Sequence, residues 1–122
     1  MNPSPPGPNP HQSILVVDDD ETMRAAMYNM FSAEYGMVMA VDGIDGCERA
    51  DLQAPDLIIS DVAMPRLDGI GMIRRMREHL ELRDVPIIFL TAKMSAADVI
   101  AGQSVHPFAY LSKSTDPGIL ER

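Results

Sequence analysis

Aspartates at the ends of two apolar runs are the residues of this chain best suited to chemistry. Asp18 and Asp19 follow the run at 14–17, and Asp61 follows the run at 57–60. Short apolar runs bounded by polar residues are typical of buried strands, and the strands of a parallel sheet end at one common edge. Clustered carboxylates repel one another and need a hard cation such as Mg2+. The sequence therefore predicts an acidic magnesium site at this edge.

Two further polar residues follow later apolar runs. Thr91 comes directly after Leu90, and Lys113 lies two residues after Leu111. A threonine hydroxyl can bond a phosphoryl oxygen, and a lysine ammonium supplies a compact positive charge to another. With the aspartates, they suit phosphoryl transfer to a carboxylate, in which Asp61 attacks as the nucleophile and forms an aspartyl phosphate. The other two aspartates would hold Mg2+, directly or through water.

Strand and helix patterns alternate strictly from residue 13 onward. Strand patterns cover 13–17, 37–41, 56–60, 86–90 and 108–111. Helical patterns run from an Asp20 cap to a stop at Gly36, from an Asp42-Gly43 turn to about 53, from Gly69, over 95–103 and after Pro117. Two stripes at helical spacing should face the core, namely Met23, Met27, Met30 and Phe31, and Met72, Ile73, Met76 and Leu80. The alternation predicts a parallel sheet covered on both faces.

Composition limits the chain to one domain. Its 122 residues, 46% of them hydrophobic, can build one core, and no apolar stretch approaches the roughly 18 residues of a membrane span. The proline-rich residues 1–12 should form a disordered leader, so the domain is expected at 13–122. A net charge of −8 argues against direct nucleic-acid binding. The single cysteine, Cys47, excludes an internal disulfide, fits a reducing cytoplasm and should be packed rather than reactive.

Four motifs occur in a characteristic order. They are Ile14-Leu15-Val16-Val17-Asp18-Asp19, Ser60-Asp61-Val62-Ala63-Met64-Pro65 with Asp68-Gly69, Leu90-Thr91-Ala92, and Tyr110-Leu111-Ser112-Lys113. From Ser13 nearly to its end, the chain resembles a response-regulator receiver domain of the single-domain chemotaxis type. The resemblance implies a flavodoxin-like, doubly wound sheet of five parallel strands in the order 2-1-3-4-5. Helices would lie on both faces, and the last helix would be short or truncated.

The resemblance also implies roles for individual residues. Asp61 would be the phosphoacceptor, and a histidine kinase or phosphotransfer protein would be the donor. Asp19 would bind Mg2+ directly, Asp18 would assist, and the backbone carbonyl of Ala63 would complete the protein's share of the coordination. Such a domain phosphorylates and dephosphorylates itself, and it turns over no external substrate beyond the donor.

A switch between two states is part of the same resemblance. Thr91 and Tyr110 would form the switch pair. A phosphoryl group adds about two negative charges and three acceptor oxygens. When Thr91 moves to bond one of those oxygens, Tyr110 can turn inward, and the surface around the last strand changes shape. Phosphorylation would then shift an existing equilibrium between two states and so control an output domain or protein.

Some segments depart from the family pattern. Lys113 is followed by Ser114 instead of proline, so a trans peptide is expected there. His106-Pro107 replaces the usual Gly-Ala, which should make the start of the last strand irregular. The sequence stops at Arg122, before the usual multi-turn helix could form. A fragment of a longer protein is the expected explanation, and a dimer that shares this surface is the alternative.

Other interpretations of the same residues stay open. An isolated Asp triplet is usually a turn and helix cap, the role expected for Asp20. A haloacid-dehalogenase-like phosphatase would need an acid at Ala63, and a nucleotide-binding Rossmann domain would need a glycine-rich turn after the first strand. A degenerate receiver that binds partners without phosphorylation is the main alternative. Arg74, Arg75 and Arg77 should form a solvated helix face, with a docking contact as the alternative.

Overall fold

The computed structural model describes residues 12–91, 107 and 109–112. In chain order the elements are β1 (Ser13–Val17), α1 (Glu21–Phe31), β2 (Gly36–Ala40), α2 (Gly43–Leu52), β3 (Leu57–Ser60), α3 (Gly69–Met76), the 3-10 helix η1 (Leu80–Leu82), β4 (Ile87–Thr91) and β5 (Ala109–Ser112). The predicted bounds of β1 are confirmed, and every other strand bound lies within one residue of its prediction.

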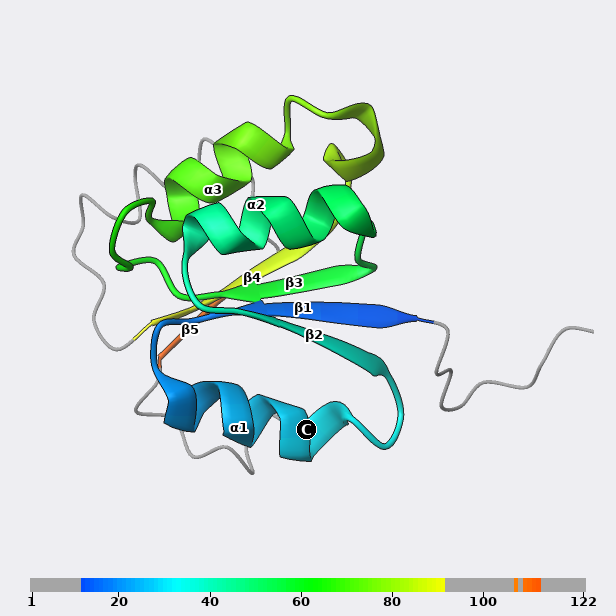
Figure 1. The fold of residues 1–122 in the computed structure, drawn as a ribbon, viewed down its shortest axis with the longest axis vertical. Coiled ribbons are helices and arrows are strands. Elements are labelled where there is room, and N and C mark those ends of the chain that lie inside the picture. Colours follow the sequence, from blue (N-terminus) through cyan, green and yellow to red (C-terminus); the bar gives the residue numbers. More distant parts are fainter. Residues whose placement is uncertain (1–11, 92–106, 108, 113–122) are drawn as a thin grey trace, which may run out of the picture.

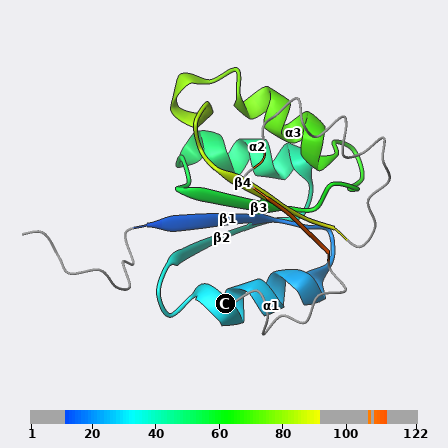
Figure 2. The same ribbon diagram turned by 180° about the vertical axis from the view of Figure 1, so that it is seen from behind.

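The five strands form one parallel sheet in the order β2-β1-β3-β4-β5. Helices α2 and α3 cover one face of this sheet and α1 lies on the other, as the two opposite views show (Figures 1 and 2). The doubly wound, flavodoxin-like fold predicted from the sequence is therefore confirmed.

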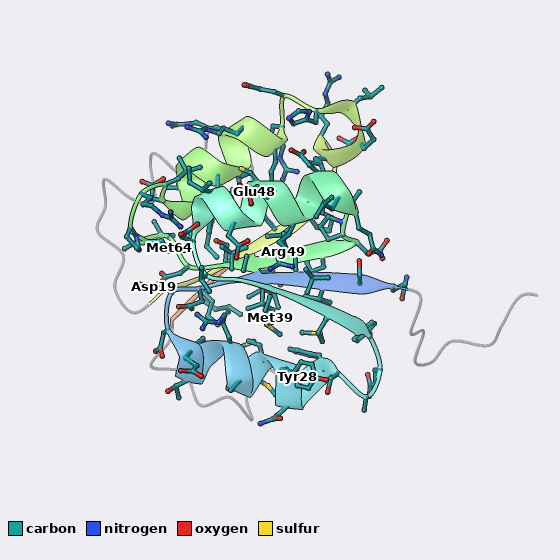
Figure 3. All side chains as sticks on the ribbon, in the orientation of Figure 1. Asp19, Tyr28, Met39, Glu48, Arg49 and Met64 are labelled. Atoms are coloured by element: carbon teal, nitrogen blue, oxygen red, sulfur yellow. The ribbon has the colours of Figure 1, made fainter. Side chains whose placement is uncertain are left out.

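Each face of the sheet has its own hydrophobic core. Leu15 and Val17 of β1 belong to the core beneath α2 and α3, whereas Ile14 and Val16 belong to the core beneath α1. Met39 of β2 also packs against the α1 core and projects into the space between the sheet and α1 (Figure 3). Because successive strand side chains point to opposite faces and both faces are covered, every position of β1 is buried. The two-sided burial explains why the strand is one continuous apolar run.

An aspartate caps the N-terminus of each α-helix in the described part of the chain. The Oδ1 atom of Asp20 accepts a hydrogen bond from an amide in the first turn of α1, as predicted. Asp42 and Asp68 do the same for α2 and α3. The prediction of a separate Asp42-Gly43 turn was wrong, because Asp42 is itself the cap and Gly43 is the first helical residue. An Asp-Gly pair is typical both of a turn and of a helix N-terminus. The hydrogen bond from the Asp45 amide to Asp42 shows that it is a helix N-terminus here.

Helix α1 is shorter than the sequence pattern suggested. It ends at Phe31, not near Gly36, and the amides of Ser32 and Tyr35 close its last turns by bonding Tyr28 and Phe31 carbonyls. Gly36 is instead the first residue of β2, where its amide donates to the carbonyl of residue 12. The apolar stripe of α1 was nevertheless predicted correctly, since Met27 is buried and Met23, Met30 and Phe31 pack around it.

The prediction of a buried apolar stripe on α3 is wrong for its last residue, Leu80. Met72, Ile73 and Met76 are buried, but Leu80 is 75% exposed. The helix ends at Met76, so the 3.6-residue period no longer applies to Leu80. Leu82 of η1 is buried in its place.

Arg77 does not belong to a solvated arginine face, so that prediction was wrong for this residue. Its Nη1 atom donates to the carbonyl oxygens of Leu82 and Val85, at 2.8 and 2.7 Å. Burial also lowers the pKa of Arg77 below its ordinary value. Arg74 and Arg75 are exposed, as expected. Arg77 therefore ties the end of α3 to the segment that leads into β4.

Several predictions concern segments outside the described residues. They are the leader at 1–11, the helix at 95–103, His106, Lys113, Ser114 and the final helical turn. The truncated last helix and the surface it would leave uncovered therefore stay predictions. Within the residues that the structure describes, no helix has the length and apolar character that a membrane crossing requires.

Candidate functional site

The register of the sheet brings the acidic residues after β1 and β3 together. Val17 pairs with Ser60, so the next residue on each strand, Asp18 and Asp61, lies at the same edge. The Asp61 amide donates to the Val17 carbonyl at 2.9 Å, and the Asp18 amide donates to the Ala40 carbonyl at 3.1 Å. These bonds extend the ladder by one step and fix the backbone of both aspartates.

Three carboxylates meet at this edge. One oxygen from each of Asp18, Asp19 and Asp61 can be chosen so that all three atoms lie within 4.8 Å of one another. Asp18 and Asp61 are buried, at 2% and 6% exposure, whereas Asp19 is exposed. Two unit charges about 4 Å apart repel by about 4 kcal/mol at an effective dielectric of 20. Close packing of these charges is therefore costly. Their proximity was predicted from the sequence, and their role as metal ligands stays a prediction.

The donor atoms fit a hard divalent cation. All three side chains offer carboxylate oxygens, and Mg2+ binds through one or two carboxylates while it keeps several waters. Asp19 is exposed and lies at the rim of the molecule (Figure 3), so the cluster is accessible to solvent at this residue. A metal site of this kind needs at least three acidic, histidine or cysteine side chains whose ligand atoms lie close together. Among the described residues, these three aspartates form such a group.

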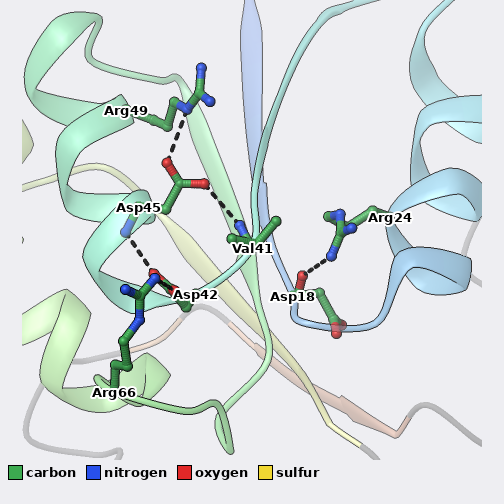
Figure 4. Close-up of polar contacts among 7 residues, drawn as sticks. All are labelled: Asp18, Arg24, Val41, Asp42, Asp45, Arg49 and Arg66. Carbon is green, nitrogen blue, oxygen red and sulfur yellow. Dashed lines mark hydrogen bonds and ion pairs between the residues drawn. The ribbon is translucent and has the colours of Figure 1, made fainter.

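Arg24 of α1 supports the β1–α1 turn, a role that the sequence analysis missed. Its Nη1 atom donates to the backbone carbonyl of Asp18 at 2.6 Å (Figure 4). The Asp20 amide donates to Oδ1 of Asp18 at 2.9 Å. An arginine one helical turn after an aspartate cap was the available signal, but its target is a backbone atom, which leaves no trace in the sequence.

The backbone around Asp61 is held from two sides. The Ser60 hydroxyl donates to the Asp61 carbonyl at 2.8 Å, and the Gly69 amide donates to the Val62 carbonyl at 2.8 Å. Gly69 also packs so closely that an added Cβ would overlap the Asp61 carbonyl oxygen. The first residue of α3 therefore has to be a glycine for the helix to approach the phosphoacceptor position predicted from the sequence.

The other predicted site residues are placed only in part. Thr91 is the last residue of β4 and pairs with Ser112, while Tyr110 pairs with Phe89. Because Phe89 also pairs with Ser60, Thr91 lies at the edge that carries Asp61. The side chains of Thr91 and Tyr110, and the whole of Lys113, lie outside what the structure describes.

Ala63 lies in the loop between β3 and α3, two residues after Asp61, and it is exposed. The same loop meets the start of α2, where the Arg66 guanidinium forms an ion pair with Asp42 (Figure 4). The Asp45 amide and then Arg66 hold the pKa of the Asp42 carboxyl below its usual range. The ion pair was not predicted, because its partners are 24 residues apart in the sequence.

Comparison with known sequences gives one consistent family. The sequence profile of the response regulator receiver domain matches residues 14–122. The alkaline phosphatase synthesis transcriptional regulatory protein PhoP of Bacillus subtilis is 34% identical over 108 residues, which are 88% of this chain and 44% of PhoP. The response regulator MprA of Mycobacterium ulcerans is 38% identical over 101 residues, 82% of this chain and 43% of MprA. The chain thus spans about half the length of such curated relatives, or slightly less.

Solved structures agree with the sequence comparison. The chemotaxis protein CheY4 of Vibrio cholerae superposes with a TM-score of 0.82 at 29% identity, over 89% of this chain and 92% of CheY4. The receiver domain of the sensor histidine kinase PA1611 of Pseudomonas aeruginosa PAO1 superposes with a TM-score of 0.80 at 31% identity, over 91% of this chain and 92% of that domain. That domain coordinates a magnesium ion in its active-site cleft. With a family profile that covers nearly all of it and three aspartates at the C-terminal edge of its parallel sheet, the chain belongs to the response regulator receiver domains of two-component signalling.

Proposed function

We propose that this domain is a phosphorylation switch whose acceptor is Asp61, with a histidine kinase or a phosphotransfer protein as the donor. The observation that carries the proposal is the cluster of Asp18, Asp19 and Asp61, buried on one side and open on the other. Mutual repulsion makes such a cluster unfavourable by itself, and binding of a cation and a phosphoryl group gives it a function. Membership of the receiver family supports phosphoryl transfer to an aspartate as the reaction.

The transfer is a displacement at phosphorus. A carboxylate oxygen of Asp61 attacks the phosphoryl group of a phosphohistidine, an O–P bond forms and the N–P bond breaks. The electron pair of the broken bond stays on the imidazole nitrogen of the donor, which takes up a proton. Hydrolysis of the aspartyl phosphate later returns the free carboxylate and inorganic phosphate.

Asp18, Asp19 and Asp61, with the backbone carbonyl of Ala63, are the groups that would hold Mg2+. When bound, the ion neutralises charge on the carboxylates and on the transferred phosphoryl oxygens. The protein's own part is positional. The ladder bonds from Asp18 and Asp61 to neighbouring strands fix the backbone from which both carboxylates project, which limits the reorganisation needed when the donor arrives.

Lys113, Thr91 and Tyr110 complete the proposed switch. Lys113 would place a positive charge on one phosphoryl oxygen, and Thr91 would donate its hydroxyl to another. Tyr110 would then move inward and reshape the surface around β5. The register that puts Thr91 at the edge of Asp61 supports this assignment.

The partners follow from the same proposal. We expect the domain to act in the cytoplasm, between a histidine kinase and an output domain or protein. PhoP and MprA are each more than twice as long as the segment they share with this chain. We therefore expect the output function to reside in a segment or partner other than the domain described.

Intact-protein mass spectrometry after incubation with acetyl phosphate tests the proposal. Wild-type protein should gain the mass of one phosphoryl group in the presence of Mg2+ and none in EDTA. Asp61→Asn should gain none, whereas Asp51→Asn, which removes the same charge from an exposed position on α2, should behave like the wild type.

A folded wild-type protein that gains no phosphoryl group from acetyl phosphate or phosphoramidate would contradict the proposal. It would favour the degenerate receiver, which binds its partners without phosphorylation. Far-UV circular dichroism of the same samples shows whether each one is folded.

A further inference from the structure

We propose that Arg66 is a positioning residue for the acidic site, acting from outside it through the loop that follows β3. Its ion pair with Asp42 fastens residues 63–65, including Ala63, to the start of α2. The consequence for metal binding rests on the function proposed above, whereas the fastening of the loop does not.

Arg66 has a backbone conformation that needs support. Its φ angle is +69°, and it is the only non-glycine residue with a positive φ in the part of the chain that the structure describes. Side chains other than glycine, asparagine and aspartate rarely adopt this left-handed region. An arginine persists there only when contacts beyond its own backbone hold it.

The ion pair with Asp42 is such a contact. Asp42 is one of three buried charged residues among those described, and its side chain is 5% exposed. One carboxylate oxygen accepts the Asp45 amide and the other accepts the Arg66 guanidinium (Figure 4). A buried carboxylate is costly without a partner. Arg66, although its side chain is 66% exposed, is therefore held firmly at its charged end.

Further contacts fix the loop on both sides of the ion pair. The Leu67 amide donates to the Pro65 carbonyl at 2.8 Å. Gly43, the first residue of α2, lies so close to Leu67 that an added Cβ would overlap the Leu67 carbonyl oxygen. At the other end of the loop, Val62 is buried and its carbonyl accepts the Gly69 amide.

Residues 63–65 lie between these two fixed points. Pro65 restricts its own φ and disfavours the helical region for Met64, which leaves this short segment few conformations. Ala63 itself is exposed. The position of the Ala63 carbonyl therefore depends on two contacts. They are the Gly69–Val62 backbone hydrogen bond on one side and the Arg66–Asp42 ion pair on the other.

An ordinary surface ion pair would have no such effect, and the chain contains one for comparison. Arg49 and Asp45 pair across one turn of α2, with side chains 50% and 22% exposed. Such an exposed pair contributes little, because water screens the charges and both side chains lose conformational freedom. It also fastens no loop, because both partners belong to the same helix. The Arg66–Asp42 pair differs because it joins the loop after β3 to the N-cap of α2 and has one buried partner.

The test uses variants that remove the guanidinium or the charge and change little else. Arg66→Asn keeps a residue that tolerates positive φ, and Asp42→Asn keeps a side chain that can cap α2. Arg49→Ala is the matched control. Magnesium affinity is measured by isothermal titration calorimetry, and amide hydrogen exchange of residues 62–69 is measured without metal.

Both loop variants should bind Mg2+ about tenfold more weakly, the low end of the effect seen for residues that orient metal ligands. Their phosphorylation by acetyl phosphate should recover at saturating Mg2+, and their amides at 62–69 should exchange faster. The double variant should be no weaker than either single one, because both changes break the same contact. Arg66→Lys should restore part of the affinity, and Arg49→Ala should change none of these quantities.

Unchanged magnesium affinity in a folded Arg66→Asn protein would overturn the inference while leaving the proposed function intact, provided that the wild type binds Mg2+ and becomes phosphorylated. Additive losses in the double variant would also overturn it, because the two residues would then act separately. A wild type that binds no Mg2+ would refute the proposed function together with this consequence. In that case amide exchange would still show whether the pair fastens the loop.

Discussion

Gly69→Ala tests how closely α3 has to approach Asp61, the proposed phosphoacceptor. The added methyl group would overlap the Asp61 carbonyl oxygen and lie 3.1 Å from the Ser60 hydroxyl. A backbone carbonyl cannot rotate away as a side chain can, so either α3 or the end of β3 has to shift. Overpacking of this kind costs about 1–3 kcal/mol. The better helix propensity of alanine returns at most about 1 kcal/mol, because the position is at the helix terminus.

The expected net effect is a loss of about 1.5 kcal/mol in the free energy of unfolding, which is the midpoint of the cost (about 2) less the midpoint of the gain (about 0.5). Gly71→Ala is the matched control in the same helix. Its added Cβ would meet the Cδ1 atom of Leu67 at 2.9 Å and Oδ1 of Asp68 at 3.1 Å. Leu67 Cδ1 is at the end of a side chain that can move, whereas Asp68 Oδ1 is held by its capping bond to the Gly71 amide and would have to shift by only a few tenths of an ångström. This substitution should therefore cost less than Gly69→Ala, and the better helix propensity of alanine offsets the cost by up to about 1 kcal/mol.

Urea unfolding followed by far-UV circular dichroism measures both variants, with an unchanged slope as the sign that the two-state comparison holds. The Gly69→Ala shift should also displace the Asp61 carboxylate. Its phosphorylation by acetyl phosphate should slow about 10- to 100-fold, because a misplacement of about 1 Å can cost that much. Equal stability of the two alanine variants would refute the reasoning, since it rests on the difference between a rigid and a movable neighbour.

Three further substitutions test other contacts. Asp20→Ala should destabilise the protein by about 1 kcal/mol in urea unfolding, and Asp20→Asn by much less, because asparagine can still cap α1. Arg77→Ala should cost about 1.5–3 kcal/mol, since it leaves two backbone carbonyls without their charged donor, whereas Arg75→Ala on the exposed side should cost little. The pKa of Asp42 is lowered from 3.8 by folding, so its stabilising contribution is complete above that pH and is lost as the pH falls through the lower folded value. The difference in unfolding free energy between wild type and Asp42→Asn should therefore be constant near neutral pH and shrink below about pH 4; a difference that grows on acidification would contradict the assigned shift.

Local sequence patterns were sufficient for the sheet and for the acidic cluster. The strands are short apolar runs because both faces of the sheet are covered, so their limits coincide with the change from apolar to polar residues. Asp18 and Asp61 could be brought together without knowledge of the strand order. Any parallel arrangement of these strands puts the residues that follow them at one edge, and the register then made them neighbours.

Contacts between distant segments were the part that the sequence could not provide. Arg77 was assigned to a solvated face because its carbonyl partners lie in the following segment and carry no side-chain signature. Leu80 was assigned to the core because the helical period was extended past the end of α3, which depends on the turn after Met76. The pairing of Arg66 with Asp42 depends on how the loop after β3 lies against α2, and no local pattern encodes that arrangement.

The distribution of buried charge explains why the stability and the function of this domain should be linked. The described residues bury three charged side chains, Asp18, Asp42 and Asp61, and all three follow strands at the same edge of the sheet. Asp42 has an arginine as its partner, and Asp18 and Asp61 lie in the cluster with Asp19. Repulsion within the cluster favours states of the edge that separate these carboxylates, and a bound cation or a phosphoryl group changes that balance. If Asp61 is the phosphoacceptor, as proposed, the edge that carries this buried charge is also the part of the domain on which phosphorylation should act first.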